Sequence, residues 1–191
     1  MLHALLKEKT RDIHQMVETH SVLNHYLSPN LSFDQYRAIV AQSYFAYSQW
    51  QKQLDNFFSS SDLDKEWHID LHAELLSDND LFKSSMHRDD VPSLLIDGVT
   101  DYLGCAYVFE GSKLGAKVIL RKLMSNPNLK NTDFTYFKKL SCHDVSWVDW
   151  MRQLDDYVLK MEFDINRIAL GAVKCFEVIN KWFEIPRASF I

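Results

Sequence analysis

The sequence contains little glycine, proline or cysteine. Its 191 residues include five glycines, four prolines and three cysteines. Glycine and proline are the residues that most often interrupt helices, so their scarcity favours an all-α fold. The cysteines, Cys105, Cys142 and Cys175, are odd in number and form no CxxC pair. That usage fits a reducing compartment better than a disulfide-stapled scaffold.

The chain also lacks a basic excess and a long hydrophobic run. Its net charge is -5, so we expect no broad basic surface for nucleic acid. No uninterrupted apolar run is long enough to cross a bilayer. The first residues, MLHALLKEKTRDIH, hold no apolar core of signal-peptide length. These absences lead us to expect a cytoplasmic protein that binds neither nucleic acid nor membrane.

The residues that are present predict one all-α domain over 1–191. Hydrophobic residues make up 47% of the chain and charged residues 25%, and apolar positions recur mostly every three to four residues, which indicates amphipathic helices. A polar connection covers Asp78 to Asp90. The expected helices are Leu2 to His20, Phe33 to Phe58 with Ser32 as N-cap, a weaker one from Leu63 to Leu76, one from Pro92 to Met124, a short one from Phe134 to Leu140, and a long region from Val145 to Phe183 closed by Pro186.

Three glycines lie on one face of the segment that follows Pro92. Gly111 and Gly115 are four residues apart and Gly104 precedes them by seven, although each glycine costs a helix about 1 kcal/mol relative to alanine. Gly111 could end one helix with Ser112 capping the next, or the small residues could let two helices pack closely. A third interpretation is a bare, kinked stretch of backbone that a flat ligand approaches directly.

The first helix carries a second patterned stripe. Lys7, Arg11, His14 and Glu18 follow one another at spacings of four, three and four, which places them on one helix face. Glu18 can accept a hydrogen bond from His14 Nδ1 and leave Nε2 free to bind a metal. Lys7 and Arg11 would offer cations to the carboxylates of an anionic ligand. The alternative is an ordinary solvated helix face.

These two stretches, LKEKTRDIHQMVE and YVFEGSKLGAKVI, together resemble the heme oxygenases, especially the short soluble bacterial forms that produce biliverdin. In that family a first-helix histidine is the proximal ligand of heme iron and a glutamate four residues later is its hydrogen-bond partner. His14 and Glu18 match these positions, with His14 as the metal ligand. The family's distal helix carries a G-x-x-x-G pattern, which Gly111 and Gly115 match.

The resemblance implies a single-domain helical bundle that holds heme b between the first helix and a kinked distal helix. Lys7, Arg11 and Lys174 would then contact the heme propionates, the last by analogy with a basic residue in the family's final core helix. Ser112 stands where membrane-anchored animal enzymes have an aspartate, and Ala116 stands where the family often has another glycine. The groups that hold the distal water therefore stay open.

The implied activity is heme oxygenase. Heme would be both cofactor and substrate, and O2 and an external electron donor would drive its cleavage to biliverdin, CO and Fe2+. Gly111 and Gly115 would steer the reaction and Ser112 would belong to the polar distal shell. The implied partner is a redox protein of the ferredoxin, flavodoxin or reductase type. The isomer of biliverdin and the biological purpose stay open.

Several alternatives remain at this point. The same fold could bind or sequester heme without turnover. A di-iron carboxylate enzyme is disfavoured because the chain has no Glu-x-x-His motif. A helical hydrolase or regulator would need a reactive cysteine, whereas the three cysteines are expected to be small core residues or inert surface thiols. His68 and His72 are four residues apart, and we interpret them as a surface pair without a third ligand.

Overall fold

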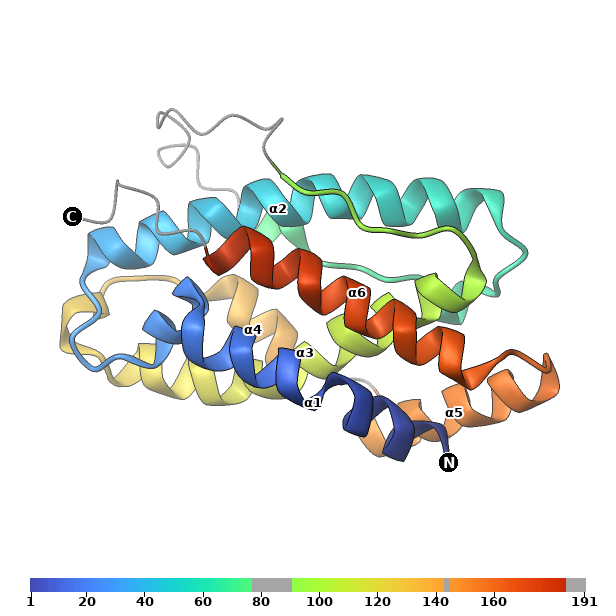
Figure 1. The fold of residues 1–191 in the computed structure, drawn as a ribbon. Coiled ribbons are helices and arrows are strands. Elements are labelled where there is room, and N and C mark those ends of the chain that lie inside the picture. Colours follow the sequence, from blue (N-terminus) through green and yellow to red (C-terminus); the bar gives the residue numbers. More distant parts are fainter. Residues whose placement is uncertain (77–90, 143–144, 185–191) are drawn as a thin grey trace.

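The computed structural model describes residues 1–76, 91–142 and 145–184. Within these ranges every regular element is a helix (Figure 1), which confirms the all-α prediction. In chain order the elements are α1 (Leu2–His20), η1 (Val22–Leu27), α2 (Phe33–Ser60), η2 (Lys65–Trp67), η3 (Ala73–Leu76), α3 (Val99–Ser125), η6 (Pro127–Leu129), α4 (Thr135–Ser141), α5 (Trp147–Lys160) and α6 (Ile165–Glu184).

Helices α1 and α2 form where their local patterns predict. The buried residues of α1 recur at helical spacing, and they are Leu2, Leu6, Thr10 and Val17. Helix α2 begins with a capping box: the Ser32 side chain accepts from the Gln35 backbone N–H, and the Gln35 side chain accepts from the Ser32 backbone N–H. Each of these bonds satisfies a backbone donor that the first helical turn would otherwise leave unpaired.

The helix predicted from Leu63 to Leu76 is wrong. Only the short 3-10 turns η2 and η3 form there, and between them the chain is not helical. Trp67, Ile69 and Leu71 are buried while the residues between them are more exposed, which is the two-residue period of an extended chain. The backbone N–H of Leu71 donates to Gln51 Oε1 of α2, so side chains supply the hydrogen bonds that a helix would have made internally.

The start predicted for the next helix is also wrong. Helix α3 begins at Val99, not at Pro92, and residues 91–98 are not helical. Pro92 instead offers its carbonyl to the indole N–H of Trp50, and Leu94 donates its backbone N–H to Gln53. Tertiary hydrogen bonds to α2 therefore hold this segment, and the helix starts only after Gly98.

The long helical region predicted from Val145 to Phe183 is two helices, α5 and α6. Residues 161–164 connect them, and Glu162 takes a left-handed backbone conformation at φ 55. That conformation cannot continue a right-handed helix. Pro186 and the polar connection from Asp78 to Asp90 lie outside the described residues.

Helix α6 is the element around which the others pack. Figure 1 shows it running between α2 and α1, and it contacts both α1 and α3 along its length. Reciprocal hydrogen bonds join it to α2: the Gln42 side chain donates to the Trp182 carbonyl, and the Trp182 indole donates to the Gln42 carbonyl. Helices α1 and α3 run in the same direction along it.

Candidate functional site: the facing segments of helices α1 and α3

Helix α3 is continuous through Gly111 and Gly115, which excludes the interpretation of a turn at Gly111. The three glycines nevertheless differ in their surroundings. A Cβ on Gly104 would lie 2.4 Å from the Ala172 backbone nitrogen and 2.6 Å from the Gly171 carbonyl carbon. Gly171 is equally tight, because its Cβ would lie 2.7 Å from Asp101 Cα. Gly104 therefore belongs to a close crossing of α3 and α6.

Further along the same face the backbone is less covered. A Cβ on Gly115 would meet no atom within 4 Å. At Gly111 it would meet only the indole of Trp147, at 3.4 Å. The expectation that both positions present bare backbone therefore needs correction: Gly115 is bare, and Trp147 covers Gly111. Between them, the Ser112 hydroxyl donates to the Phe109 carbonyl at 2.7 Å.

The stripe predicted on α1 faces outward. Lys7, Arg11, His14 and Glu18 are all exposed residues of that helix. The His14 ring packs edge-on against Phe176 of α6, with centroids 5.2 Å apart. His14 Nε2 lies 3.6 Å from Glu18 Oε1. His14 and Glu18 are thus neighbours, but the distance is longer than a hydrogen bond, and the ring presents Nε2 to the carboxylate instead of the expected Nδ1.

Helices α1 and α3 touch just before the candidate residues. The Tyr107 hydroxyl lies near the Thr10 side chain, whose hydroxyl donates to the Leu6 carbonyl at 2.8 Å. Desolvation by burial raises the pKa of Tyr107. His14 follows Thr10 by one turn, and Gly111 follows Tyr107 by one turn.

Beyond the candidate residues η1 contacts both helices. Tyr26 of η1 and Ala116 of α3 are buried in the same core cluster. The segments of α1 and α3 between these two contact points therefore carry His14 and Glu18 on one side and Gly111, Ser112 and Gly115 on the other. From Tyr107 to Ala116 the helix rises about 14 Å at 1.5 Å per residue. We name these two stretches, residues 11–19 of α1 and 108–115 of α3, the facing segments.

Lys174 lies elsewhere. Its ammonium donates to Asp101 Oδ1 at 3.3 Å, in the first turn of α3, and both side chains are largely buried. Lys174 precedes Phe176 by two residues, which puts the two side chains about 200° apart around α6. Phe176 is the residue that contacts His14. The structure therefore does not bring Lys174 beside His14.

A cavity of about 310 Å³ lies against a neighbouring face of α3. Its lining includes Glu110 and Lys113, which form an ion pair with each other, and Trp147 and Trp150 of α5. Trp147 thus stands between this cavity and Gly111. No signal in the local sequence pattern around Trp147 indicates that it covers a candidate site glycine.

The described residues of α1 fit a heme better than those of α3. An imidazole with an adjacent carboxylate projects from a solvent-accessible helix face, and Lys7 and Arg11 have no ion-pair partner within the described ranges. Gly115 leaves space for a flat ring. At Gly111 the indole of Trp147 would have to shift before a porphyrin could touch the backbone. The residues present can therefore hold the group, with one rearrangement on the α3 side.

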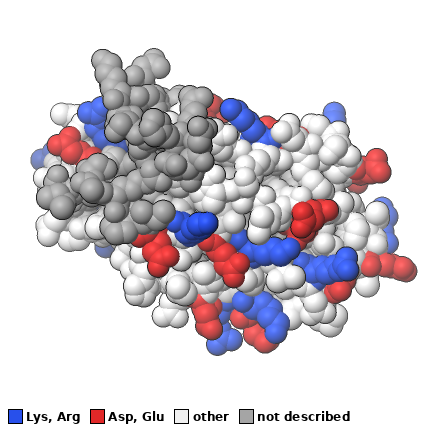
Figure 2. Space-filling model, turned by 45° about the horizontal axis from the view of Figure 1, so that its top comes forward, with Lys and Arg blue, Asp and Glu red and all other residues white. Residues whose placement is uncertain are grey.

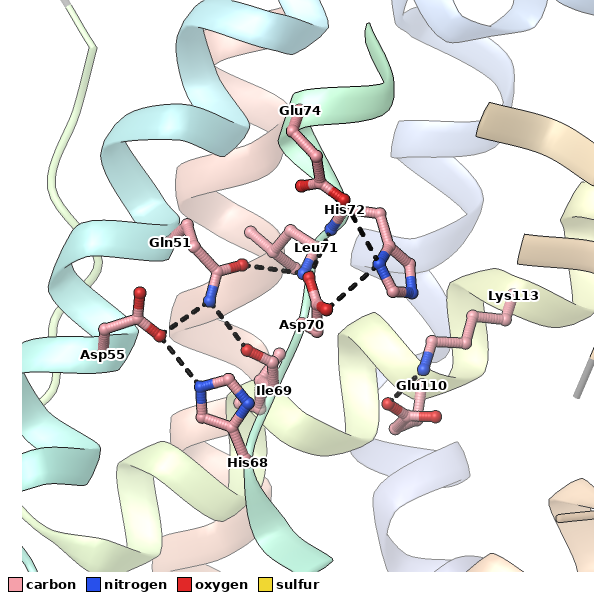
Figure 3. A network of polar contacts seen from close by, with 10 residues as sticks. All are labelled: Gln51, Asp55, His68, Ile69, Asp70, Leu71, His72, Glu74, Glu110 and Lys113. Atoms are coloured by element: carbon pink, nitrogen blue, oxygen red, sulfur yellow. Dashed lines mark hydrogen bonds and ion pairs between the residues drawn. The ribbon is translucent and has the colours of Figure 1, made fainter. Parts of the chain in front are cut away.

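The other histidine pair does not form a joint metal site. Figure 3 shows His68 turned toward α2 and His72 turned away from it. His68 Nε2 lies 2.9 Å from Asp55 Oδ1. His72 Nδ1 lies 3.1 Å from Asp70 Oδ2 and 3.8 Å from Glu74 Oε1 (Figure 3). Asp70, His72 and Glu74 each place one potential metal-ligand atom within 4.8 Å of the other two. The ion pairs between His72 and the two carboxylates account for this proximity.

The cysteines are unpaired, as expected. Cys105 and Cys175 are buried and Cys142 is exposed. Burial raises the pKa of the Cys175 thiol, so it does not supply a reactive thiolate. On the face drawn in Figure 2, lysine and arginine side chains are interspersed with acidic ones. The described part of that face offers no continuous basic surface for a phosphate backbone.

The described residues form an all-α protein in which the first helix carries His14 and Glu18 and a later helix carries Gly111 and Gly115. A family model for heme oxygenase matches residues 1–94. The matched stretch, which carries His14 and Glu18, is therefore similar to the heme oxygenase family. No curated protein and no solved structure matches the chain. Among the described residues, no helix is long and apolar enough to cross a membrane.

Proposed function

We propose that the protein is a heme oxygenase that converts heme to biliverdin, CO and Fe2+. The observation that carries this proposal is the family match over the segment that contains His14 and Glu18. Similarity to this family implies heme binding. The specific products, the use of O2 and an external electron donor, and a redox protein as partner are the proposal's own content.

In the proposed site His14 is the iron ligand and Glu18 fixes its ring. A modest rotation of the exposed imidazole would point one nitrogen at the iron and leave the other near the Glu18 carboxylate, which lies 3.6 Å away in this structure. Such a partner orients the ring and raises its basicity. Arg11 lies one turn and Lys7 two turns before His14 on the same face, and both would neutralise the propionates.

On the opposite side Gly115 and, after movement of Trp147, Gly111 would roof the ring with bare main chain. When bound, heme supplies the redox and oxygen chemistry. The chain's own contribution is to hold the ring, exclude bulky side chains from its α3 face and place a hydroxyl nearby. The Ser112 hydroxyl donates to the Phe109 carbonyl, so its oxygen can still accept a hydrogen bond from a water.

Two features reduce the role assigned to Lys174. Its ammonium is paired with Asp101, and it lies on the other side of α6 from the His14 contact. We therefore assign the propionates to Lys7 and Arg11. If Lys174 contributed directly, Lys174→Met would weaken hemin binding as much as Lys7→Met does. We expect Lys174→Met to act on stability instead, because it leaves Asp101 without its partner.

The test begins with binding. Hemin is added to the protein and the Soret band is recorded, and a reductant is then supplied with catalase present. Loss of the Soret band with formation of bile pigment supports the proposal. A Soret band that persists through reduction and oxygenation supports the non-catalytic heme-binding alternative, which the Trp147 indole over Gly111 favours.

A substitution of His14 tests its assignment as the iron ligand. His14→Ala should lose bile-pigment formation and change the iron spectrum, and added imidazole should restore the wild-type spectrum. His20→Ala is the matched control, since His20 is an exposed histidine on the same helix whose Nδ1 contacts Thr19. Full activity of His14→Ala would refute the assignment.

A further inference from the structure

A chain of aromatic side chains leads away from the facing segments. Tyr107 and Trp147 have ring centroids 5.6 Å apart, and Trp147 stacks on Trp150 at 5.4 Å with an interplanar angle of 14°. Trp150 lies 6.2 Å from Trp67, which lies 4.8 Å from Tyr157. Each step is within the range of direct ring contact. Every member is tyrosine or tryptophan, the aromatic residues that lose an electron most readily.

The chain begins beside the proposed heme site. Tyr107 lies near Thr10, and these two residues are one turn before Gly111 and His14 on their helices. Trp147 covers Gly111 directly. An oxidant that forms between the facing segments would therefore meet this end of the chain first.

The middle of the chain contains an unusual indole. Trp67 is 3% exposed, and its Nε1 has no hydrogen-bond acceptor among the described residues. Two other buried indoles are paired: Trp50 donates to the Pro92 carbonyl and Trp182 to the Gln42 carbonyl. An oxidised indole is trapped when it passes its N–H proton to an acceptor. Without an acceptor Trp67 keeps the proton, stays a strong oxidant and takes an electron from its neighbour.

The far end of the chain can release a proton. Tyr157 is only partly buried and lies near enough to Asp64 and Glu66 for their charges to act on its hydroxyl. A tyrosine that loses an electron also loses its phenol proton, which these carboxylates or solvent can accept. Tyr157 is therefore suited to be the end of the chain, where an external reductant can restore it.

We propose that Tyr107, Trp147, Trp150, Trp67 and Tyr157 conduct oxidising equivalents from the heme site to the surface. The location of the starting point rests on the proposed function. The oxidant would be hydrogen peroxide acting at bound heme, and reduction of one peroxide to two waters takes two electrons and two protons. The two electrons leave the chain one at a time from Tyr107 or Trp147, and each is replaced along the chain from Tyr157, which loses one electron and one proton each time. An external one-electron donor of the phenol or ascorbate class restores Tyr157 after each transfer, so two restorations supply the two electrons and two protons. The path would spare His14 and the neighbouring protein side chains from oxidation by peroxide that does not react productively with the porphyrin.

The first experiment needs no heme. Azide radicals generated by pulse radiolysis oxidise accessible tryptophans. Trp147 and Trp150 are half-buried and are therefore the accessible tryptophans of the chain, whereas Trp67 is buried. We expect the tryptophanyl signal to decay into a tyrosyl signal at a rate independent of protein concentration. Tyr157→Phe should remove most of that tyrosyl signal, and Trp67→Phe should slow its formation. A tyrosyl yield that is unchanged in Tyr157→Phe would overturn the path.

Matched controls separate conduction from stability. Trp50→Phe removes a similarly buried indole outside the chain, and Tyr136→Phe removes a tyrosine that contacts no member of it. Both should keep the wild-type transfer from tryptophan to Tyr157. If Trp50→Phe slows the transfer as much as Trp67→Phe does, the loss reflects general disturbance of the fold and the proposed path is rejected.

The second experiment locates the source. The hemin-loaded protein is treated with hydrogen peroxide and a nitroso spin trap, and the modified residues are mapped by mass spectrometry. We expect an adduct on Tyr157 that is lost in Trp67→Phe. A normal Soret band with adducts only outside the chain would overturn the path and leave the heme proposal intact. Absence of hemin binding would refute the proposed function, and the radiolysis result would then decide the path alone.

Discussion

Gly104 and Gly115 share one face of α3 but have opposite surroundings. At Gly104 the α6 backbone lies where a Cβ would be, and at Gly115 no atom lies within 4 Å. The first glycine lets two helices approach more closely than any side chain would permit. The second gains nothing from packing and still weakens its helix. This difference is the reason why we propose Gly115, and not Gly104, as a ligand-facing position.

The largest expected effect is at the closed end of this face. Gly104→Ala would place a methyl group 2.4 Å from a backbone nitrogen, so α3 and α6 must separate. We expect a loss of about 3 kcal/mol in the free energy of unfolding, at the upper end of overpacking penalties, measured by urea denaturation. A loss below about 1 kcal/mol would mean that the crossing adapts.

At Gly115, the open end of this face, we expect a substitution to change the yield of the reaction. Gly115→Leu should leave the Soret band of the hemin complex in place and lower the yield of bile pigment about tenfold, equivalent to about 1.4 kcal/mol in the activation barrier. The physical reason is that a side chain on this face would stand where the ring or its oxygen must fit. Gly115→Leu with wild-type pigment yield would remove Gly115 from the site.

The smaller substitution at the same position should change stability in the opposite direction from Gly104→Ala. Gly115→Ala adds a methyl group in open space and removes the helix penalty of glycine. We expect the heme-free protein to gain about 1 kcal/mol in the free energy of unfolding. Equal destabilisation by the two alanine substitutions would break the comparison between the two ends of the face.

The smallest expected effect concerns Tyr102, which lies two residues before Gly104. Desolvation raises its pKa to about 12, and its hydroxyl accepts a hydrogen bond from the Ile69 backbone N–H. The folded state thus holds the proton more tightly than the unfolded state, so the stabilisation is complete below pH 10 and is lost as pH rises toward 12. Urea denaturation of Tyr102→Phe from pH 9 to pH 12 should show a shallower decline than wild type.

Part of the fold could be predicted from local pattern. Helices α1 and α2 begin where predicted because an apolar stripe in one, and the Ser32 capping box in the other, act within a few residues. The helix predicted from Leu63 to Leu76 failed because Gln51 and Tyr102 supply hydrogen bonds to the backbone of Leu71 and Ile69 from distant elements. No local signal reveals such bonds.

The candidate site also contains contacts within one helix, which the sequence can predict, and contacts between helices, which it cannot. The pairing of His14 with Glu18 follows from a spacing of four residues on one helix, and the structure places these residues together. The neighbours of Lys174 and Gly111 could not be predicted, since Asp101 and Trp147 reach them from other helices. The proximity that the sequence predicted is the one that lies within a single helix.

The spacing of Gly104, Gly111 and Gly115 already places them on one face, because helix geometry converts spacing into direction. The packing of the other helices sets their surroundings: α6 covers Gly104, Trp147 covers Gly111, and no described residue covers Gly115. Direction is a property of one helix, whereas coverage depends on where another helix crosses it. The crossing is set by the packing of the whole core, to which no short stretch of sequence corresponds.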